Sequence, residues 1–146
     1  MCHTLEQKSA GIGLAATQVG ESVAVAVIGI KPTPSRPNLK RQELIMINPV
    51  VIKTYGHRTG MWEACISGTD LYAMALRYKK VRLRYQDEDA KEHERDFEGL
   101  MAHVIQHEVD HLNGILFVDR VKDTSTYMTG HEYRKMKKHE GITPKT

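Results

Sequence analysis

The segment QHEVDH, residues 106–111, constrains most strongly what this chain can fold into. It contains the pattern His107-Glu108-x-x-His111 inside a run, from about residue 97 to residue 112, that has helical periodicity. Positions i and i+4 share one helix face, so two imidazoles can bind one metal ion while Glu108 reaches a water beside it. The alternative is that both histidines are merely exposed or packed. The helical context favours a metal site.

The composition indicates the class of protein to which this helix belongs. The chain has 146 residues, of which 40% are hydrophobic and 27% charged, and this predicts one globular domain. No apolar run approaches the ~20 residues that a membrane span needs, and the first residues do not resemble a secretory signal. Two cysteines cannot form a disulfide scaffold, so we expect Cys2 and Cys65 to be thiols in a reducing compartment. A net charge of +3 does not by itself indicate nucleic-acid binding.

Most of the remaining sequence is strand-like. Residues 22–30 and 43–55 are rich in β-branched side chains, and the Pro-rich stretch 31–38 between them predicts a surface loop. Residues 78–87 alternate, with Val81, Leu83 and Tyr85 on one face. A turn and a short partner strand, ERDF, follow before the helix, and residues 114–121 after it indicate another short strand. The sequence predicts an α+β fold in which antiparallel β-sheets surround a central helix carrying the His-Glu-x-x-His motif.

The segment GIGLAATQVG, residues 11–20, has the spacing Gly11-x-Gly13-x-x-Ala16 of a dinucleotide-binding turn. Such a site needs a strand before the glycines and a helix after them. Only ten residues precede Gly11, and a β-branched run follows the segment. We therefore predict that it binds no dinucleotide.

A third protein ligand is needed, because a catalytic zinc-type site offers three side chains and keeps one position for water. His103 lies one helical turn before His107, but three ligands along one helix cannot easily surround an ion. Glu132 lies downstream and Cys65 upstream, in MWEACISG. A lone cysteine is more often a small buried hydrophobe, and composition and spacing leave this choice open.

Three segments together, GIGLAATQ, EACIS and QHEVDH, resemble the three signature motifs of the peptide deformylases, in that family's order. The resemblance extends from about Gly11 to Asp119. It implies that Cys65, His107 and His111 hold one divalent metal ion. The family usually uses ferrous iron, and the same ligands also suit zinc, nickel or cobalt.

The reaction implied by the resemblance is hydrolysis of the formyl group from N-formylmethionyl peptides, with release of formate. The metal would acidify its bound water and polarise the formyl oxygen, and Glu108 would transfer the proton from the water to the leaving amine. The implied oxyanion donors are the Gln18 amide and the backbone N–H of Ile66. The structural alternative for Gln18 is a buried amide that bonds neighbouring backbone.

The resemblance also implies how a peptide would bind. Ile12 and Gly13 would offer backbone hydrogen bonds, as an added strand does, and the carbonyl of Ala64 would accept a substrate N–H. The methionine side chain would enter an apolar pocket, for which the family match implies Ile12, Met61, Leu100, His103, Val104 and His107.

Four departures from the family pattern qualify these expectations. Ala64 replaces a usual glycine and would be strained if its φ were positive. Tyr72 stands where many members carry arginine, and His103 where an apolar residue is usual. Only ten residues precede the glycine motif, where members normally carry some tens including a helix.

We predict one metal-hydrolase domain over residues 1–123 and a basic C-terminal helix or tail over residues 124–146. The tail is a candidate for ribosome binding through residues 134–138, although a solvated tail is the simpler interpretation. We expect a monomer without membrane contact, in a bacterial cytoplasm or an organelle matrix. Two alternatives stay open, namely a different His-Glu-x-x-His metallohydrolase and a catalytically weakened homologue that acts as a binding module.

Overall fold

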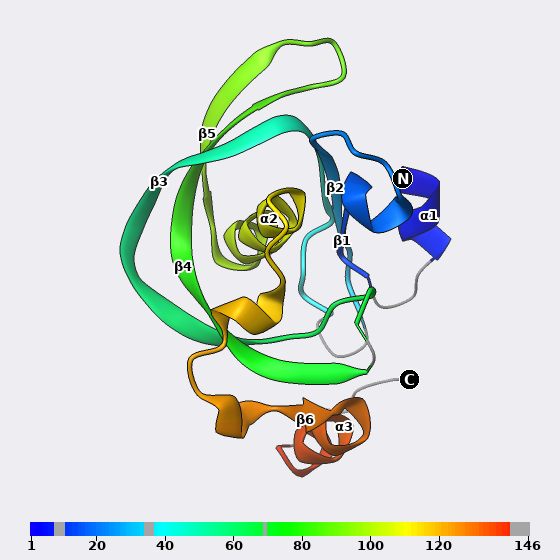
Figure 1. Ribbon diagram of the computed structural model, residues 1–146, viewed down its shortest axis with the longest axis vertical. Helices are drawn as coiled ribbons and strands as arrows, with labels where there is room; N and C mark the ends of the chain where they lie inside the picture. The colour runs from blue at the N-terminus through cyan, green and yellow to red at the C-terminus, as the bar shows by residue number, and fades with distance from the viewer. Residues whose placement is uncertain (8–10, 34–36, 69, 141–146) are drawn as a thin grey trace.

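A computed structural model describes residues 1–7, 11–33, 37–68 and 70–140 (Figure 1). Three 3-10 turns, labelled η, accompany its helices and strands. In chain order the elements are α1 (Cys2–Gln7), β1 (Gly13–Ala15), η1 (Ala16–Val19), β2 (Val25–Ile30), β3 (Gln42–Glu63), β4 (Leu71–Gln86), β5 (Glu92–Glu98), α2 (Gly99–Leu112), η2 (Phe117–Arg120), η3 (Thr124–Thr126), β6 (Met128–Thr129) and α3 (Gly130–His139).

The strands form an antiparallel sheet in the order β1-β2-β3-β4-β5, and β6 pairs with the start of β4. Strand β3 has 22 residues and β4 has 16, so a flat pairing would carry them past the core. Their ladder instead contains register shifts, one of them between Tyr55 and Arg58. Such irregularities bend a strand and increase its twist. The two strands accordingly curve around α2 (Figure 1).

Helix α2 is the centre of the fold. Its residues Met101, Ala102, Val104 and Ile105 are buried in one core cluster with side chains of β2, β3 and β4. The helix ends at Leu112, and Gly114 follows with a φ of +73°, a conformation that favours glycine. The predicted α+β fold with antiparallel strands around this helix is confirmed.

Strand β4 confirms the alternation in the sequence. Val81, Leu83 and Tyr85 are buried against α2, as predicted. The strand begins at Leu71, seven residues earlier than the alternation indicated, and β3 continues eight residues beyond its predicted end to Glu63. These extensions bring Glu63 of β3 and Arg77 of β4 beside α2.

The strand predicted for residues 114–121 is wrong, because residues 117–120 form the 3-10 turn η2. Asp119 stabilises this turn by accepting a hydrogen bond from the Leu116 backbone N–H at 2.9 Å. Only Val121 makes an isolated β-bridge, to Ala75 of β4. The hydrogen bond from the Leu116 N–H to Asp119 therefore favours a turn here, although the β-branched residues favour a strand.

The glycine segment forms a short edge strand instead of a nucleotide-binding turn. Strand β1 pairs with β2, and η1 follows it and ends at Gly20, whose φ is +85°. Before it, α1 packs Leu5 beside Leu14 and Val27. Residues 34–36 of the predicted Pro-rich loop lie outside the described residues.

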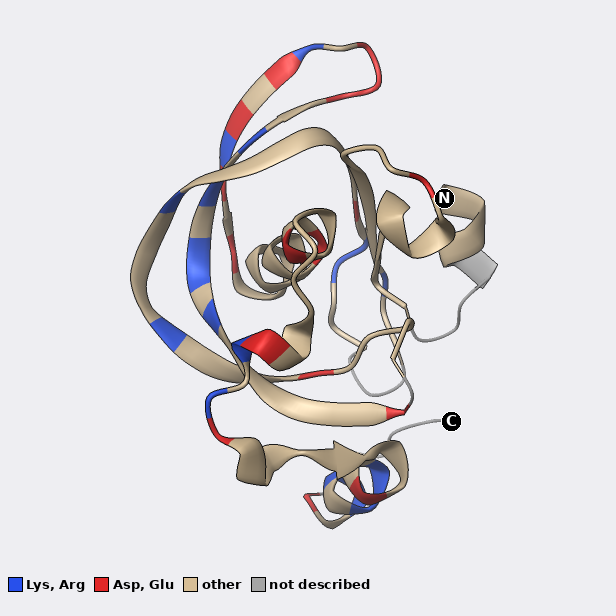
Figure 2. Cartoon of the chain, in the orientation of Figure 1, with Lys and Arg blue, Asp and Glu red and all other residues tan. Residues whose placement is uncertain are grey.

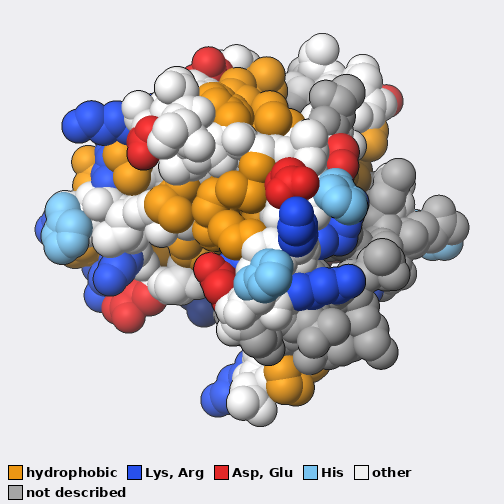
Figure 3. All heavy atoms as spheres, turned by 90° about the horizontal axis from the view of Figure 1, so that it is seen from below, with side chains coloured by type: hydrophobic (Ala, Val, Ile, Leu, Met, Phe, Trp, Pro, Cys, Tyr) orange, Lys and Arg blue, Asp and Glu red, His pale blue; other side chains and the backbone are white. Residues whose placement is uncertain are grey.

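The C-terminal part does form a helix, α3, although residues 141–146 of the predicted tail lie outside the described residues. Tyr133 of α3 stacks on Tyr72 with ring centroids 4.1 Å apart, and it also contacts Trp62. Lysine and arginine residues occur along β3, β4 and α3, with acidic residues among them (Figure 2). Seen from below, apolar side chains gather near the middle of the face, with both signs of charge around them (Figure 3). No helix in the described part of the chain is long and apolar enough to cross a bilayer.

Candidate metal centre

Three side chains from two elements converge beside α2. The Cys65 Sγ lies 3.2 Å from Nε2 of His111, which lies 3.0 Å from Nε2 of His107. All three ligand atoms lie within 4.8 Å of one another. A tetrahedral ion with bonds of ~2.0–2.3 Å would hold such atoms about 3.3–3.6 Å apart, so a small expansion would accommodate it. The geometry fits a divalent metal.

The fold supplies these ligands in a simple way. His107 and His111 lie one turn apart on the buried helix, and their rings meet edge to face. Cys65 follows the end of β3, where the carbonyl of Cys65 accepts a hydrogen bond from the N–H of Gly68 at 2.9 Å. The long strand thus brings the thiol to the helix, while the turn fixes its backbone.

The protonation chemistry of these groups also suits a metal. Burial opposes ionisation of Cys65, but hydrogen bonds from His107 and His111 outweigh it and lower the thiol pKa to about 5. For His107, burial favours the neutral ring, yet contacts with Cys65 and Glu63 raise its pKa to about 9. Cys65 is therefore a thiolate at neutral pH, which is the form that binds metal.

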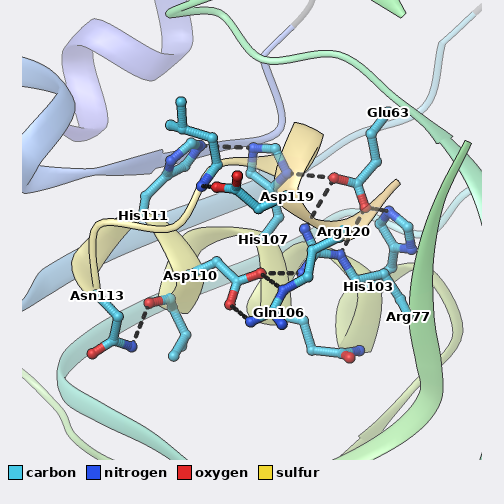
Figure 4. Close-up of polar contacts among 12 residues, drawn as sticks. Glu63, Arg77, His103, Gln106, His107, Asp110, His111, Asn113, Asp119 and Arg120 are labelled. Carbon is cyan, nitrogen blue, oxygen red and sulfur yellow. Dashed lines mark hydrogen bonds and ion pairs between the residues drawn. The ribbon is translucent and has the colours of Figure 1, made fainter. Parts of the chain in front are cut away.

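Glu63 connects the ligand helix to β3 (Figure 4). Its Oε2 lies 2.8 Å from Nδ1 of His107, so Nδ1 keeps a proton and Nε2, which must release its own proton, is the nitrogen that can bind a metal. Arg77 of β4 binds both carboxylate oxygens, at 2.8 and 3.1 Å. Burial alone would raise the pKa of Glu63, but hydrogen bonds from His103, His107 and Arg77 hold it far below its usual range. Glu63 is a buried, fully paired carboxylate.

The same network continues behind the helix. Arg77 also forms an ion pair with Asp110, and Arg120 of η2 binds both oxygens of Asp110 at 2.6 and 2.9 Å (Figure 4). Two carboxylates and two guanidinium groups thus alternate from β3 to η2. The network ties three elements to the helix that carries the histidines.

Glu108 is buried in a different way. It is only 3% exposed, and its Oε2 has no hydrogen-bond partner in the described part of the chain. Burial raises its pKa to about 7, with His107 and His111 acting in the opposite direction. Its carboxylate packs against Gly13, where an added Cβ would lie 2.2 Å from Oε1. A carboxylate with a pKa near neutrality can both accept and donate a proton.

Gln18 brings its amide to the thiol. Its Nε2 donates to Cys65 Sγ at 3.2 Å and to Ser67 Oγ at 2.9 Å, while its Oε1 accepts from the Ala15 backbone N–H at 2.9 Å. The amide is thereby held by backbone, as the structural alternative requires, with its donor end at the ligand sulfur. The turn residue Ile66 lies beside it and is exposed.

A pocket of about 200 Å³ opens next to these groups. The predicted substrate residues all line it, together with parts of the metal centre: Ile12, Gly13, Gln18, Met61, Ala64, Cys65, Ile66, Leu100, His103, Val104, His107 and Glu108. Tyr72 and Trp62 line it as well. Residues far apart in the sequence therefore share one cavity.

Among the alternatives for the third ligand, the positions of the side chains favour Cys65. Among the described residues, the group that could hold an ion contains Cys65 and neither Glu132 nor His103. Glu132 lies on α3, and His103 faces Glu63. Ala64 is not among the described non-glycine residues with positive φ, so the strain considered for this departure is absent.

The paired network is what sequence reasoning missed. Arg77 occupies the inward phase of β4 together with Ala73 and Ala75, and an arginine in that phase is a signal of a buried ion pair. In the sequence the apolar alternation is clear only from residue 78 onward, so the position of Arg77 does not stand out. Glu63 and Asp110 stood inside the quoted motifs without an assigned role.

Comparison with known proteins identifies the family. The sequence profile described as "Polypeptide deformylase" matches residues 1–127. A peptide deformylase of Mesorhizobium japonicum is 38% identical over 128 residues, which cover 88% of this chain and 70% of that protein. One of Chlorobaculum parvum is 41% identical over 115 residues, which cover 79% of this chain but only 60% of that protein. The chain thus spans roughly 60–70% of the length of these curated relatives.

Solved structures of peptide deformylases are also similar to this chain. A class I type b peptide deformylase from Acinetobacter baumannii, crystallised with Met-Ala-Ser bound, superposes with a TM-score of 0.75 at 33% identity, covering 82% of this chain and 76% of the other. A probable peptide deformylase from Synechococcus phage S-SSM7 gives a TM-score of 0.71 at 37% identity, covering 82% and 78%. The prediction of a metal-dependent amide hydrolase is confirmed at the level of the family. The fold, the cysteine-histidine centre and these relatives together show that the chain belongs to the peptide deformylase family.

Proposed function

We propose that this chain removes the formyl group from N-formylmethionyl peptides and releases formate. One observation carries the proposal: Cys65, His107 and His111 form a metal-binding group, and Glu108 lines the same pocket with an unpartnered oxygen. A divalent ion held there would polarise the formyl oxygen and acidify a water molecule. Family membership gives the reaction class, and the pocket gives room for a side chain.

Glu108 is proposed to move the proton. Its pKa of about 7 lets it take a proton from water and pass it to the leaving amine at neutral pH. The absence of a Cβ at Gly13 leaves room for its carboxylate. Its unpartnered Oε2 is free to accept the proton.

Gln18 is proposed to stabilise the negative charge that develops on the formyl oxygen. Its Nε2 lies 3.2 Å from Cys65 Sγ and has no backbone acceptor among the described residues, so this donor can turn to a substrate oxygen beside the metal. Its carbonyl end stays fixed by Ala15. The backbone N–H of Ile66 is proposed as the second donor.

The peptide is proposed to bind along β1. This strand is at an edge of the sheet path, and one side is used by β2. The other side faces the pocket that Ala64 also lines, and there the backbone of Gly13 is proposed to offer hydrogen bonds for strand addition. The Ile12 carbonyl accepts from the Gly29 N–H at 3.0 Å, so it would use its second lone pair for the peptide. The methionine side chain would then lie among Met61, Leu100, His103 and Val104.

The metal is proposed to be ferrous iron, with zinc, nickel and cobalt as the alternatives that the same ligands accept. The bacterial relatives favour a bacterial cytoplasm as the place of action over an organelle matrix. We also propose a monomer that approaches the ribosome through α3, where Lys135 and Lys138 are exposed. Salt-sensitive cosedimentation with ribosomes, lost in a Lys135→Glu/Lys138→Glu variant, tests the last point.

The activity is tested by loading the chain anaerobically with Fe²⁺ and measuring formate from formyl-Met-Ala-Ser. The wild type should release formate, and Glu108→Ala should not while still binding metal. Equal, background release by both would overturn the proposal in favour of a binding module. Metal bound equally well by Cys65→Ala would instead indicate a different metallohydrolase site.

A further inference from the structure

His103 is a polar residue in the wall of the pocket proposed for the first side chain. It lies on α2, one turn before His107, and is 6% exposed. Its neighbours in that wall include Met61, Leu100 and Val104, which are apolar. The imidazole therefore changes the chemistry of an otherwise hydrophobic surface.

The ring is incompletely satisfied. Its Nε2 lies 2.6 Å from Oε1 of Glu63, the distance of an ion pair (Figure 4). Its Nδ1 has no hydrogen-bond partner among the residues that the structure describes. A nitrogen so close to a carboxylate oxygen must carry a proton, because two acceptors would repel one another.

The two carboxylates near the ring already have other partners. Glu63 and Asp110 form ion pairs with Arg77, and Asp110 also pairs with Arg120. With Nε2 of His103 directed to Glu63, Nδ1 is the ring nitrogen left to pair with a bound side chain. A buried polar atom without a partner is costly.

A bound side chain can recover part of that cost. The χ2 torsion of histidine is broad, so a modest ring rotation can turn the free nitrogen to a donor in the pocket. Methionine offers no donor there. Glutamine has the same unbranched length and ends in an amide that donates.

We propose that His103 is a specificity-determining residue that lets the pocket accept a first side chain with a hydrogen-bond donor, such as glutamine, alongside methionine. The inference rests on the proposed function, because it assumes that the first side chain enters this pocket. The substrate class is an N-formyl peptide whose first residue is unbranched and polar at its end.

The test compares kcat/KM for formyl-Gln-Ala-Ser and formyl-Met-Ala-Ser in the metal-loaded wild type and in His103→Leu. We expect the glutamine-to-methionine ratio to fall about tenfold in His103→Leu, the value of about one hydrogen bond. His103→Asn keeps a polar group and should retain most of the ratio. Ile105→Val, a buried change on the same helix away from the pocket lining, should leave it unaltered.

A second measurement needs no turnover and no variant. Calorimetry with the product peptides Gln-Ala-Ser and Met-Ala-Ser should give affinities of the metal-loaded wild type within about tenfold of each other. An unchanged ratio in His103→Leu, or a preference of the wild type for Met-Ala-Ser far beyond tenfold, would overturn the inference. Absence of formate with both substrates would count against the proposed function alone, since peptide binding would still test His103.

Discussion

Two buried carboxylates flank the metal-binding group, and the fold treats them in opposite ways. Glu63 is 5% exposed and Glu108 is 3% exposed. Glu63 faces Arg77, His103 and His107, and its pKa lies far below the usual range. Glu108 has an unpartnered oxygen and a pKa of about 7. Two similarly buried carboxylates thus have opposite pKa shifts, and the difference comes from their hydrogen-bond and ion-pair partners.

The largest expected effect is a loss of activity when Glu108, the carboxylate with the unpartnered oxygen, is changed. Glu108→Gln keeps the shape of the side chain but cannot exchange a proton, so kcat/KM for formyl-Met-Ala-Ser should fall about 10²–10⁴-fold. Metal content should stay at the wild-type level. Formate assays paired with metal analysis check both points, and a variant with nearly full activity would remove Glu108 from the proposed role.

Replacing Arg77, which pairs with both Glu63 and Asp110, should destabilise the fold. Arg77→Met leaves Glu63 and Asp110 buried without their shared cation, which should lower the free energy of unfolding by about 3–5 kcal/mol. Urea denaturation measures the loss. The double variant Arg77→Met/Glu63→Gln should recover part of it, because the carboxylate that lost its guanidinium partner is then neutral, while Asp110 keeps Arg120. If Arg77→Met were as stable as the wild type, the ion network would not stabilise the fold.

A smaller effect is expected where Glu108 meets β1. Gly13→Ala places a Cβ 2.2 Å from the present position of Oε1, so the carboxylate must move. We expect kcat/KM to fall about 10–100-fold, since small misplacements of a reacting group are costly. Gly29→Ala on β2 is the matched control, because its Cβ would meet only a Leu5 methyl at 3.4 Å. Equal activity of both variants would show that Glu108 tolerates displacement.

The smallest effects are opposite pH dependences of stability in the metal-free chain. The pKa of Glu108 is raised by burial, so its stabilising contribution is present below about pH 4 and is lost as pH rises to about 7. Glu108→Gln should therefore stabilise the chain by about 1–3 kcal/mol at pH 8 and by little at pH 4.

Asp110 provides the contrasting case. Burial would raise its pKa, but hydrogen bonds from Arg120 and Arg77 lower it. Its contribution is present above the unfolded-state value of about 4 and is lost as pH falls further. The deficit of Asp110→Asn should accordingly shrink on acidification. Urea midpoints from about pH 2 to pH 8 check both variants, and parallel curves would refute the distinction.

The same comparison explains what the sequence could predict. The helix with His107 and His111, the strand with Val81 and Leu83, and the antiparallel fold follow from periodicity and motif spacing, because these depend on neighbours within one element. The choice of Cys65 over Glu132 depended on family resemblance. The partners of Glu63 come from β4 and α2, 14 and 44 residues away, and no local pattern contains such pairings. The sequence predicted a strand at residues 117–120 because of their β-branched composition. The turn forms because the Asp119 side chain accepts a hydrogen bond from the Leu116 N–H.

The central claim is that Glu63 positions a metal ligand whereas Glu108 takes part in the reaction. Formate release from formyl-Met-Ala-Ser, measured against Fe²⁺ concentration under anaerobic conditions for Glu63→Gln and Glu108→Gln, tests it most directly. Glu63→Gln should bind metal about 10–100-fold more weakly and regain most activity at high Fe²⁺. Glu108→Gln should bind metal normally and stay inactive at every concentration. Recovery of Glu108→Gln by added metal, with Glu63→Gln inactive even when fully loaded, would contradict the account.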